Sequence, residues 1–193
     1  MPAAGTSTKS DERRHAVMAA AVERFAHKGF YGTTTHEIAE SAGISQPYLY
    51  RLYPNKEALF AAAVGYVSDI MAEALTTHSP IPDAGEMTPE HALAAARDAY
   101  GALVADRTIL RFLMHANCAA GEPLVRDAVR RCYAKQIDIV LQLLHGDDEA
   151  VRRWLGAGMV DNVAFALDLP NVDEPWARVL SSDHAPLPAR PLT

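Results

Sequence analysis

Apolar residues recur at helical spacing along most of the chain, and the alternation typical of half-buried strands is absent. The first segment with this pattern, residues 10–28, begins with acidic residues, which suit the positive end of a helix dipole. Gly29 follows it and suits a helix end. Its apolar stripe, at positions i, i+3, i+4 and i+7, consists of Met18, Ala21, Val22 and Phe25. The pattern therefore predicts an all-α fold that begins with a helix over residues 10–28.

Two short helices are predicted next. Thr34 and Glu37, three residues apart, fit a capping box, in which each side chain bonds the other residue's backbone N–H at a helix start. The tight turn SAGI ends this helix, and Ser45 suits the N-cap of the next one. Pro47 then falls in the first turn, where a missing N–H costs nothing, and Pro54 ends the helix.

The remaining chain is also predicted to be helical. A long fourth helix has Asn55 as its N-cap and apolar residues from Leu59 to Leu75, and a Pro-rich loop over residues 78–90 follows it. Further helices are predicted near residues 88–104, 107–118, 122–145 and 148–168. After Pro170 the chain turns Pro-rich, with too little apolar surface to stay ordered alone.

The second and third predicted helices and their turn have the arrangement of a helix-turn-helix, whose second helix enters a DNA major groove. Because such a helix stays exposed, its polar groups are free to meet phosphates and base edges. The side chains that suit these contacts are Ser45, Gln46, Pro47, Tyr48, Tyr50 and Arg51. The first four lie at the N-terminal end, where base contacts concentrate, and the Pro47 ring suits a thymine methyl group.

Lys56 also points to a bound anion. A cation in the first turn of a helix interacts unfavourably with the helix dipole and destabilises the helix by ~0.3–1 kcal/mol. A phosphate at that place would reverse the sign, because the Lys56 ammonium and the free N–H groups of the helix would then act together.

Composition and charge limit the other possibilities. Hydrophobic residues make up 49% and charged residues 22% of the 193 residues, an ordinary mix for a soluble globular protein. No stretch approaches 18 uncharged apolar residues, and the N-terminus lacks the apolar core of a signal peptide, so we expect neither a membrane span nor secretion. Residues 1–57 have a net charge of +1 and residues 58–193 of −7, so the acid lies away from the predicted DNA-binding helices. Cys118 and Cys132 form no motif, and buried free thiols are expected.

Residues 25–60, FAHKGFYGTTTHEIAESAGISQPYLYRLYPNKEALF, resemble the N-terminal domain of the tetracycline-repressor (TetR) family of bacterial transcription regulators. The resemblance covers about residues 10–71, roughly a third of the chain. One difference is Tyr53, where the family usually has Phe. The matching positions are Phe25, Gly29, Phe30, Thr34, Thr35, Ile38, Ala39, Ala42, Gly43, Ile44, Ser45, Leu49, Tyr50, Lys56, Glu57 and Leu59.

The resemblance implies roles for these residues. Thr34, Thr35 and His36 would open the second helix against the DNA backbone. Gln46, Pro47 and Tyr48 would read bases. Tyr50, Arg51 and Lys56 would hold phosphates, and Arg51 could also reach a base. For the basic residues that precede the first helix, the alternatives are contacts to DNA and ordinary solvated charge, and we favour the latter for Lys9, Arg13 and Arg14.

The resemblance further implies a C-terminal part that binds a small ligand and forms a homodimer through two helices of each subunit. We expect one interface helix in residues 148–170, where small residues at 156–158 would allow close approach, and a second in residues 122–145. Packing inside one subunit is the alternative for the same residues. The interface candidates in the first of these helices are Trp154, Leu155, Gly158, Met159 and Phe165.

The ligand site is expected among the fourth to eighth helices, and its Ala- and Leu-rich surroundings favour a fairly apolar effector. For each candidate, burial in the core is the alternative interpretation. A metal is not expected, since two neighbouring ligand-type side chains make no site, and no cofactor is expected. The candidate lining residues are Tyr66, Tyr100, Phe112, His115, Cys118 and Asn162.

The sequence thus predicts a cytoplasmic, homodimeric, ligand-responsive repressor that binds a palindromic operator in double-stranded DNA. The predicted domains are a DNA-binding head (10–54), a ligand-binding and dimerisation domain (72–170) and a Pro-rich tail (171–193). The alternatives are a small all-α enzyme and a helical interaction module with a vestigial DNA-binding head. The enzyme has little support, because the chain lacks the common nucleophile, P-loop and zinc-protease motifs.

Overall fold

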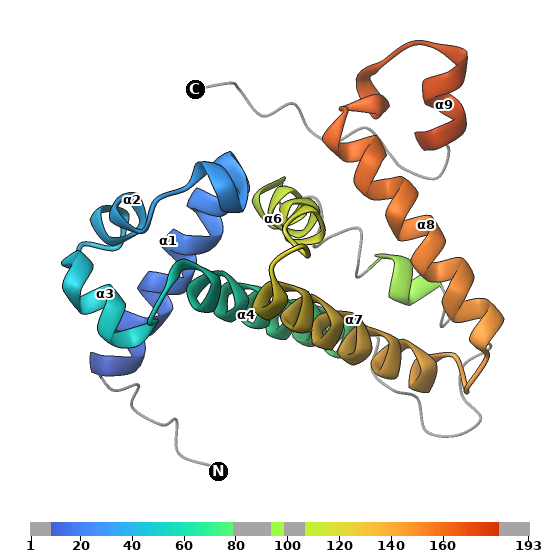
Figure 1. Cartoon of the computed structure of the whole chain (residues 1–193). Helices are drawn as coiled ribbons and strands as arrows, with labels where there is room; N and C mark the ends of the chain where they lie inside the picture. The colour runs from blue at the N-terminus through green and yellow to red at the C-terminus, as the bar shows by residue number, and fades with distance from the viewer. Residues whose placement is uncertain (1–8, 79–93, 99–106, 182–193) are drawn as a thin grey trace. The chain divides into compact units, whose positions relative to one another are not determined.

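The computed structural model describes residues 9–78, 94–98 and 107–181 (Figure 1). All regular structure in these ranges is helical, which confirms the predicted all-α fold. The chain divides into two compact units, the first built from residues 1–67 and 112–132 and the second from residues 68–111 and 133–193. These units follow the packing of the chain and include segments far apart in the sequence. They do not test the predicted boundaries of the DNA-binding head, the ligand-binding domain and the tail, which remain predictions.

The helices lie close to where the apolar pattern predicts them. The described elements are α1 (Lys9–Gly32), α2 (Thr35–Ser41), α3 (Gln46–Leu52), α4 (Lys56–His78), α6 (Arg107–Cys118), α7 (Pro123–Leu143), α8 (Asp148–Ala166), the short 3-10 helix η1 (Leu169–Asn171) and α9 (Pro175–Ser181). The predicted loop over residues 78–90, most of the predicted helix over residues 88–104, and Tyr100 lie outside the described residues.

The core of the first unit is an aromatic cluster that joins α1, α4 and α6. Phe60 of α4 contacts Phe25 edge-on with ring centroids 4.6 Å apart, and it stacks on Phe112 at 5.2 Å. Phe30 meets Phe60 edge-on at 5.4 Å. Phe25, Phe60 and Phe112 are fully buried. Such ring pairs stabilise the core beyond the effect of burying their apolar surface. This cluster anchors both the end of α1 and the start of α4, between which α2 and α3 lie in the sequence.

Gly29 interrupts α1 instead of ending it. Its φ of 68° and ψ of −178° lie outside the helical region, yet helical turns continue to Gly32. Glycine is the residue that adopts a positive φ without steric cost. The His115 ring of α6 also packs against Gly29, with its Nδ1 2.8 Å from the place where a Cβ would be. The predicted helix end is thus a break that turns the chain toward α2.

The second unit packs α7 and α8 around Trp154, whose Nε1 donates to the carbonyl oxygen of Ala96 at 3.3 Å. On α4, Asp69 pairs with Lys135 of α7 at 2.6 Å, and the Ser68 carbonyl accepts from Gln136 at 3.3 Å. The buried members of the main cluster are Leu75, Ala96, Val140, Leu143, Leu144, Ala150, Val151 and Trp154.

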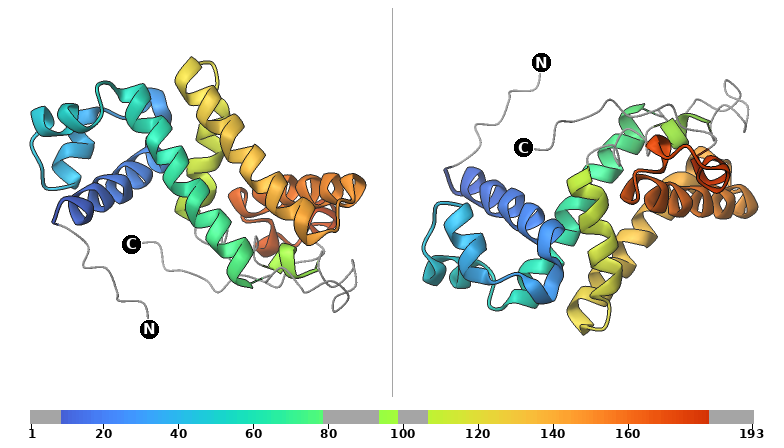
Figure 2. Two further views of the ribbon diagram at one scale, coloured as in Figure 1. Left: turned by 90° about the horizontal axis from the view of Figure 1, so that it is seen from below. Right: turned by 90° about the horizontal axis from the view of Figure 1, so that it is seen from above.

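Helix α9 is an element that the apolar pattern does not predict. A small cluster of Ala164, Leu169 and Ala177 packs η1 and α9 against the end of α8 (Figure 2). Residues 171–181 are therefore largely folded in this structure, although the composition after Pro170 suggests too little apolar surface for order. The difference arises because the tail uses apolar surface that α8 supplies.

Both cysteines are free, but Cys118 at the end of α6 is exposed, so the prediction of a buried thiol is wrong there and confirmed for Cys132.

By length and composition alone, α4 could cross a membrane, since Lys56–Thr77 has a mean hydropathy of 1.5. Half of this apolar stretch is buried inside the protein, as in the core helix of a folded domain.

Candidate nucleic-acid interface

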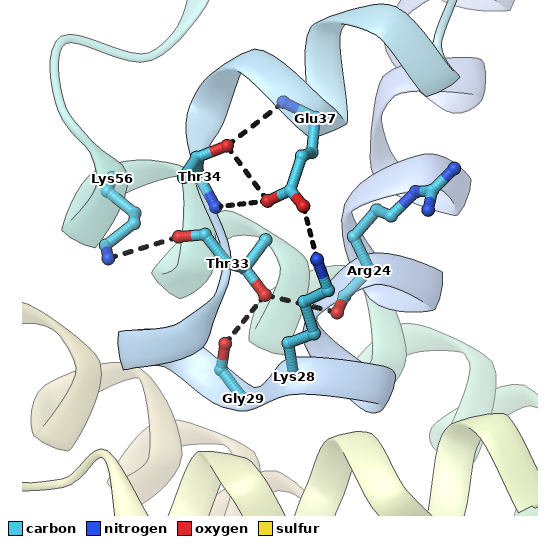
Figure 3. A network of polar contacts seen from close by, with 7 residues as sticks. All are labelled: Arg24, Lys28, Gly29, Thr33, Thr34, Glu37 and Lys56. Atoms are coloured by element: carbon cyan, nitrogen blue, oxygen red, sulfur yellow. Dashed lines mark hydrogen bonds and ion pairs between the residues drawn. The ribbon is translucent and has the colours of Figure 1, made fainter.

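The start of α2 is fixed by the predicted capping box, which the structure confirms (Figure 3). The Thr34 side chain accepts from the Glu37 backbone N–H at 3.2 Å, and a Glu37 carboxylate oxygen accepts from the Thr34 backbone N–H at 2.9 Å. Lys28 of α1 forms an ion pair with the same carboxylate. Hydrogen bonds from Lys28 and Thr34 lower the pKa of Glu37 to about 2, so Glu37 is ionised at neutral pH.

The turn between α2 and α3 sets the direction of α3. Gly43 adopts a φ of 65°, and the Ile44 N–H donates back to the Ala39 carbonyl at 3.0 Å. The Ser45 side chain accepts from the Tyr48 backbone N–H at 3.3 Å, which confirms the predicted N-cap. Leu49 is the buried residue of α3. A seven-residue helix with a single fully buried side chain leaves most of its surface outside.

Several predicted DNA contacts lie on this outer surface. Pro47, Tyr50 and Arg51 of α3 are exposed, and Gln46 and Tyr48 are half-buried. The Arg51 guanidinium carbon lies 6.0 Å from the centre of the Tyr48 ring, within the range of a cation–π contact. This contact keeps the Arg51 charge beside the N-terminal half of α3. At the start of α2, Thr34 and His36 are exposed as well.

Thr35 behaves differently from its neighbours, because it is 8% exposed and its hydroxyl is used inside the protein. The Thr35 Oγ1 accepts from the Gln46 amide nitrogen at 2.9 Å. It also forms a hydrogen bond of 2.9 Å with the Tyr50 hydroxyl. One buried hydroxyl of α2 thus joins two side chains of α3 that are predicted to meet DNA.

Lys56 sits at the first position of α4, after Asn55, whose side chain accepts from the Ala58 N–H at 2.7 Å as predicted for an N-cap. Its ammonium donates to the Thr33 carbonyl at 3.3 Å and lies 4.6 Å from the centre of the Phe30 ring. Figure 3 shows the hydrogen bond from Lys56 to the Thr33 carbonyl, beside the capping box of Thr34 and Glu37. Lys56 is therefore held in place, and helix spacing alone could not have indicated its partners.

Buried Thr33 links these contacts to α1. Its hydroxyl donates to the Gly29 carbonyl at 2.8 Å and lies 3.2 Å from the Arg24 carbonyl (Figure 3). Thr33, Phe30 and Lys28 are absent from the predicted site, because their contacts with Lys56 and Glu37 join segments that are separate in the sequence. The run of threonines at 33–35 is the one feature of the sequence that could have drawn attention to this place.

The predicted ligand residues fall in both units. In the first unit, Phe112 is a core residue, His115 is half-buried against Gly29, and Cys118 is exposed. Tyr66, also in the first unit, is half-buried and lies edge-on to His15 with ring centroids 5.4 Å apart. Asn162 is buried in the second unit. Each unit by itself brings together only part of the predicted set.

The predicted interface residues divide by exposure. Trp154, Gly158 and Phe165 are buried within the chain, Leu155 is half-buried, and Met159 is exposed. An apolar stripe is nevertheless present on α8. It consists of Met159, Val160 and Val163 of the helix and its C-cap Leu167, at spacings of one, three and four residues, and each is at least 38% exposed. Gly156 extends the stripe by one turn, with nothing within 4 Å of a Cβ built there.

Comparisons with known proteins agree with this geometry. Residues 17–63 match the family model of the bacterial regulatory proteins, tetR family. The HTH-type transcriptional regulator RutR of Escherichia coli K12 is 40% identical over 58 residues, which are 30% of this chain and 27% of RutR. The aligned stretch thus spans about a quarter of this curated relative.

Solved structures match over much more of the chain. A tetR-family transcriptional regulator from Streptomyces coelicolor has a TM-score of 0.62 at 21% identity, covering 89% of this chain and 77% of that one. The transcriptional regulator FadR of Bacillus subtilis, in complex with stearoyl-CoA, has a TM-score of 0.64 at 16% identity, covering 88% and 94%. At these identities the likeness concerns the fold, an N-terminal helix-turn-helix followed by a helical C-terminal part.

Residues 17–63 thus form a capped helix-turn-helix with an exposed second helix, and this segment matches the DNA-binding domain model of the tetR family. Over 58 residues the sequence is similar to a transcriptional regulator, RutR.

Proposed function

We propose that this chain is a homodimeric, ligand-responsive repressor that binds a palindromic operator and is released by a small molecule. The observation that carries the proposal is α3 itself. Its cap and one buried leucine hold it, while Pro47, Tyr50 and Arg51 are exposed and Gln46 and Tyr48 are half-exposed. Such a helix can enter a major groove without disturbing the core beneath it.

The proposed contacts follow from exposure and chemistry. Gln46, Pro47 and Tyr48 meet base edges, and Ser45 contributes mainly through its cap. Tyr50, Arg51 and Lys56 meet phosphates. Thr34 and His36 meet the DNA backbone at the exposed start of α2.

The apolar stripe of α8 supports the homodimer. Single exposed apolar residues are ordinary, but a contiguous row along one helix face indicates a surface that another helix covers. A second copy of the same helix is the proposed partner, since a symmetric pair of heads matches the two halves of a palindrome. The exposed Gly156 would let the two helices approach closely.

We propose further that a fairly apolar small molecule binds in the C-terminal part. FadR, bound to stearoyl-CoA, has the same fold with an apolar chain as ligand, which supports this class of effector. The effector would act by linkage, because it binds the conformation with low operator affinity more tightly than the other. The protein would act in the cytoplasm, where its DNA is, and would perform no catalysis.

A mobility-shift titration on the DNA upstream of the protein's own gene tests the proposal. A regulator should shift this fragment well below the concentration needed for unrelated DNA of equal length, with a footprint of two related half-sites. A repressor should also lower transcription from that promoter in a purified system. Equal affinity for all fragments would leave the enzyme or the interaction module with a vestigial head as the better explanation.

A further inference from the structure

We infer that Thr35 is a positioning residue for DNA recognition, whose buried hydroxyl orients the Gln46 amide and the Tyr50 phenol toward the operator. The inference rests on the proposed function, in which Gln46 meets a base edge and Tyr50 meets a phosphate. It gives Thr35 a role different from the direct backbone contact that the sequence suggests.

The burial of Thr35 argues against a direct contact. Only 8% of the residue is exposed, whereas Tyr50 beside it is 45% exposed. Its oxygen lies 2.9 Å from the Gln46 Nε2 and 2.9 Å from the Tyr50 hydroxyl oxygen, both within hydrogen-bond distance. Its hydroxyl is thus used by protein groups, and the little exposed surface leaves poor access for a phosphate.

The bond to Gln46 holds the amide against α2, with Nε2 toward Thr35. A glutamine amide has nearly the same shape when its oxygen and nitrogen are exchanged, so a free side chain can present either. Because the Thr35 oxygen accepts from Nε2, the Gln46 carbonyl oxygen and the second N–H remain for an outside partner. An outward carbonyl suits a base with a major-groove amine, which means adenine or cytosine.

The bond to Tyr50 extends the same arrangement. The Thr35 oxygen accepts from Gln46, and either hydroxyl can be the donor in the contact between Thr35 and Tyr50. With Thr35 as the donor, Gln46 donates to Thr35, Thr35 donates to Tyr50, and the Tyr50 O–H is left for a phosphate. Each bond in such a chain polarises the next, which favours one direction throughout.

Four single variants of the full-length protein separate this role from a structural one. Thr35→Val keeps the shape and removes the hydroxyl, and Thr35→Ser keeps the hydroxyl. Gln46→Ala removes the proposed reader. Thr33→Val is the matched control, because Thr33 is also buried and also loses hydrogen bonds, but it touches neither Gln46 nor Tyr50.

The measurement is affinity, at one salt concentration, for the preferred duplex and for duplexes changed at single base pairs. Gln46→Ala should lose roughly 5- to 150-fold of the preference at one base pair. Thr35→Val should lose at least half of that factor on a logarithmic scale, at the same base pair. Thr35→Ser and Thr33→Val should keep it. The double variant Thr35→Val with Gln46→Ala should discriminate no worse than Gln46→Ala alone.

A second measurement needs no DNA. The side-chain amide protons of Gln46, assigned by their loss in Gln46→Ala, should have one shifted and protected member in the NMR spectrum of the wild type and of Thr35→Ser. In Thr35→Val the pair should move to the values of a solvated glutamine. This result remains decisive if the melting temperature of Thr35→Val falls, provided that the variant is folded at the temperature of measurement.

Full base preference in folded Thr35→Val, or its loss in Thr35→Ser or Thr33→Val, would overturn the inference. Gln46 side-chain amide protons with the same chemical shifts in wild type and Thr35→Val would overturn it as well. Failure of the proposed function gives a different result, since the wild type itself would then show no preferred duplex. If the wild type and Gln46→Ala prefer the same base pairs by the same factor, Gln46 does not read a base. The positioning role of Thr35 is then excluded as well.

Discussion

At the scale of single residues, Lys56 combines an unfavourable position with specific support. Its charge opposes the dipole of α4, but the Thr33 carbonyl and the Phe30 ring both attract it. These contacts hold the ammonium at the helix N-terminus, where the free N–H groups of α4 would bind the same phosphate.

Lys56→Gln should therefore weaken binding to all duplexes by a similar factor. It keeps a polar donor but removes the charge, so the slope of log affinity against log salt should fall by about 1. The slope is measured from titrations at several salt concentrations. Arg97→Ala, which removes an exposed charge from the second unit, serves as the control and should leave the slope unchanged. Equal slopes for wild type and Lys56→Gln would exclude Lys56 from the phosphate contacts.

Gly29 is the other residue whose identity the geometry demands. Gly29→Ala would place a Cβ 2.8 Å from the His115 Nδ1, at a φ of 68° that side chains rarely adopt. We expect the free energy of unfolding to fall by roughly 1–3 kcal/mol, as for strained backbone positions. A urea titration measures this. Gly43→Ala has a similar φ but open space around the Cβ, so it should cost less. Equal costs would mean that the His115 contact is unimportant.

At the scale of secondary-structure elements, the capping box of α2 makes stability depend on pH. The pKa of Glu37 falls from 4.5 to about 2 in the folded protein. Its ionised form therefore stabilises the fold above about pH 4.5, and this contribution is lost as the pH falls toward 2. Glu37→Gln should lower the melting temperature at pH 7. The difference from wild type should shrink between pH 4.5 and pH 2, and a difference independent of pH would contradict the assigned pKa.

Local signals explain why the sequence predicts these elements well. The caps by Thr34, Ser45 and Asn55 depend on side chains within three residues of the helix start, and all three are confirmed. The buried stripe of α1 follows from periodicity and is confirmed as well.

Contacts between distant segments could not be predicted in the same way. Thr35 and Gln46 are 11 residues apart and Lys56 and Thr33 are 23 apart, so their meeting depends on how the helices pack. For the same reason the buried Trp154 and the exposed Val163 look alike in the sequence, since both are apolar residues of α8. The DNA-contact, ligand and interface residues remain predictions, because the chain alone contains none of those partners.

The exposed stripe of α8 leads to a prediction about oligomeric state. Val163→Asp puts a charge in the middle of the stripe, at a residue that is 41% exposed and so adds little to the core. The protein should shift from dimer to folded monomer in sedimentation equilibrium, because burying an unpaired charge is costly. Met114→Asp, at an exposed apolar residue of α6 outside both predicted interface helices, should leave the dimer intact. A Val163→Asp protein that stays dimeric would place the interface elsewhere.

At the scale of the whole molecule, charge and function are divided along the chain. Residues 58–193 have a net charge of −7, which repels DNA, and the head region of residues 1–57 is nearly neutral overall. In the proposed function, affinity comes from individual groups such as Arg51 and Lys56, and not from a general attraction between this acidic protein and DNA. A second head on the same dimer is the simplest way to strengthen such contacts, because it raises the effective concentration at the other half-site.

The spacing of the operator half-sites tests whether two heads of one dimer bind together. If two heads bind one palindrome together, both half-sites must lie on the same side of the duplex at a fixed separation. Inserting five base pairs between them turns one half-site to the opposite side, so affinity should fall toward that of a single half-site, by roughly 10²–10⁴-fold. The Val163→Asp protein should be insensitive to the insertion, since its heads act separately. The measurement is a titration of both proteins on the original and the extended operator at one salt concentration. A wild type that binds both operators equally well would mean that its heads do not act as a pair, and the homodimeric mode of recognition would be wrong.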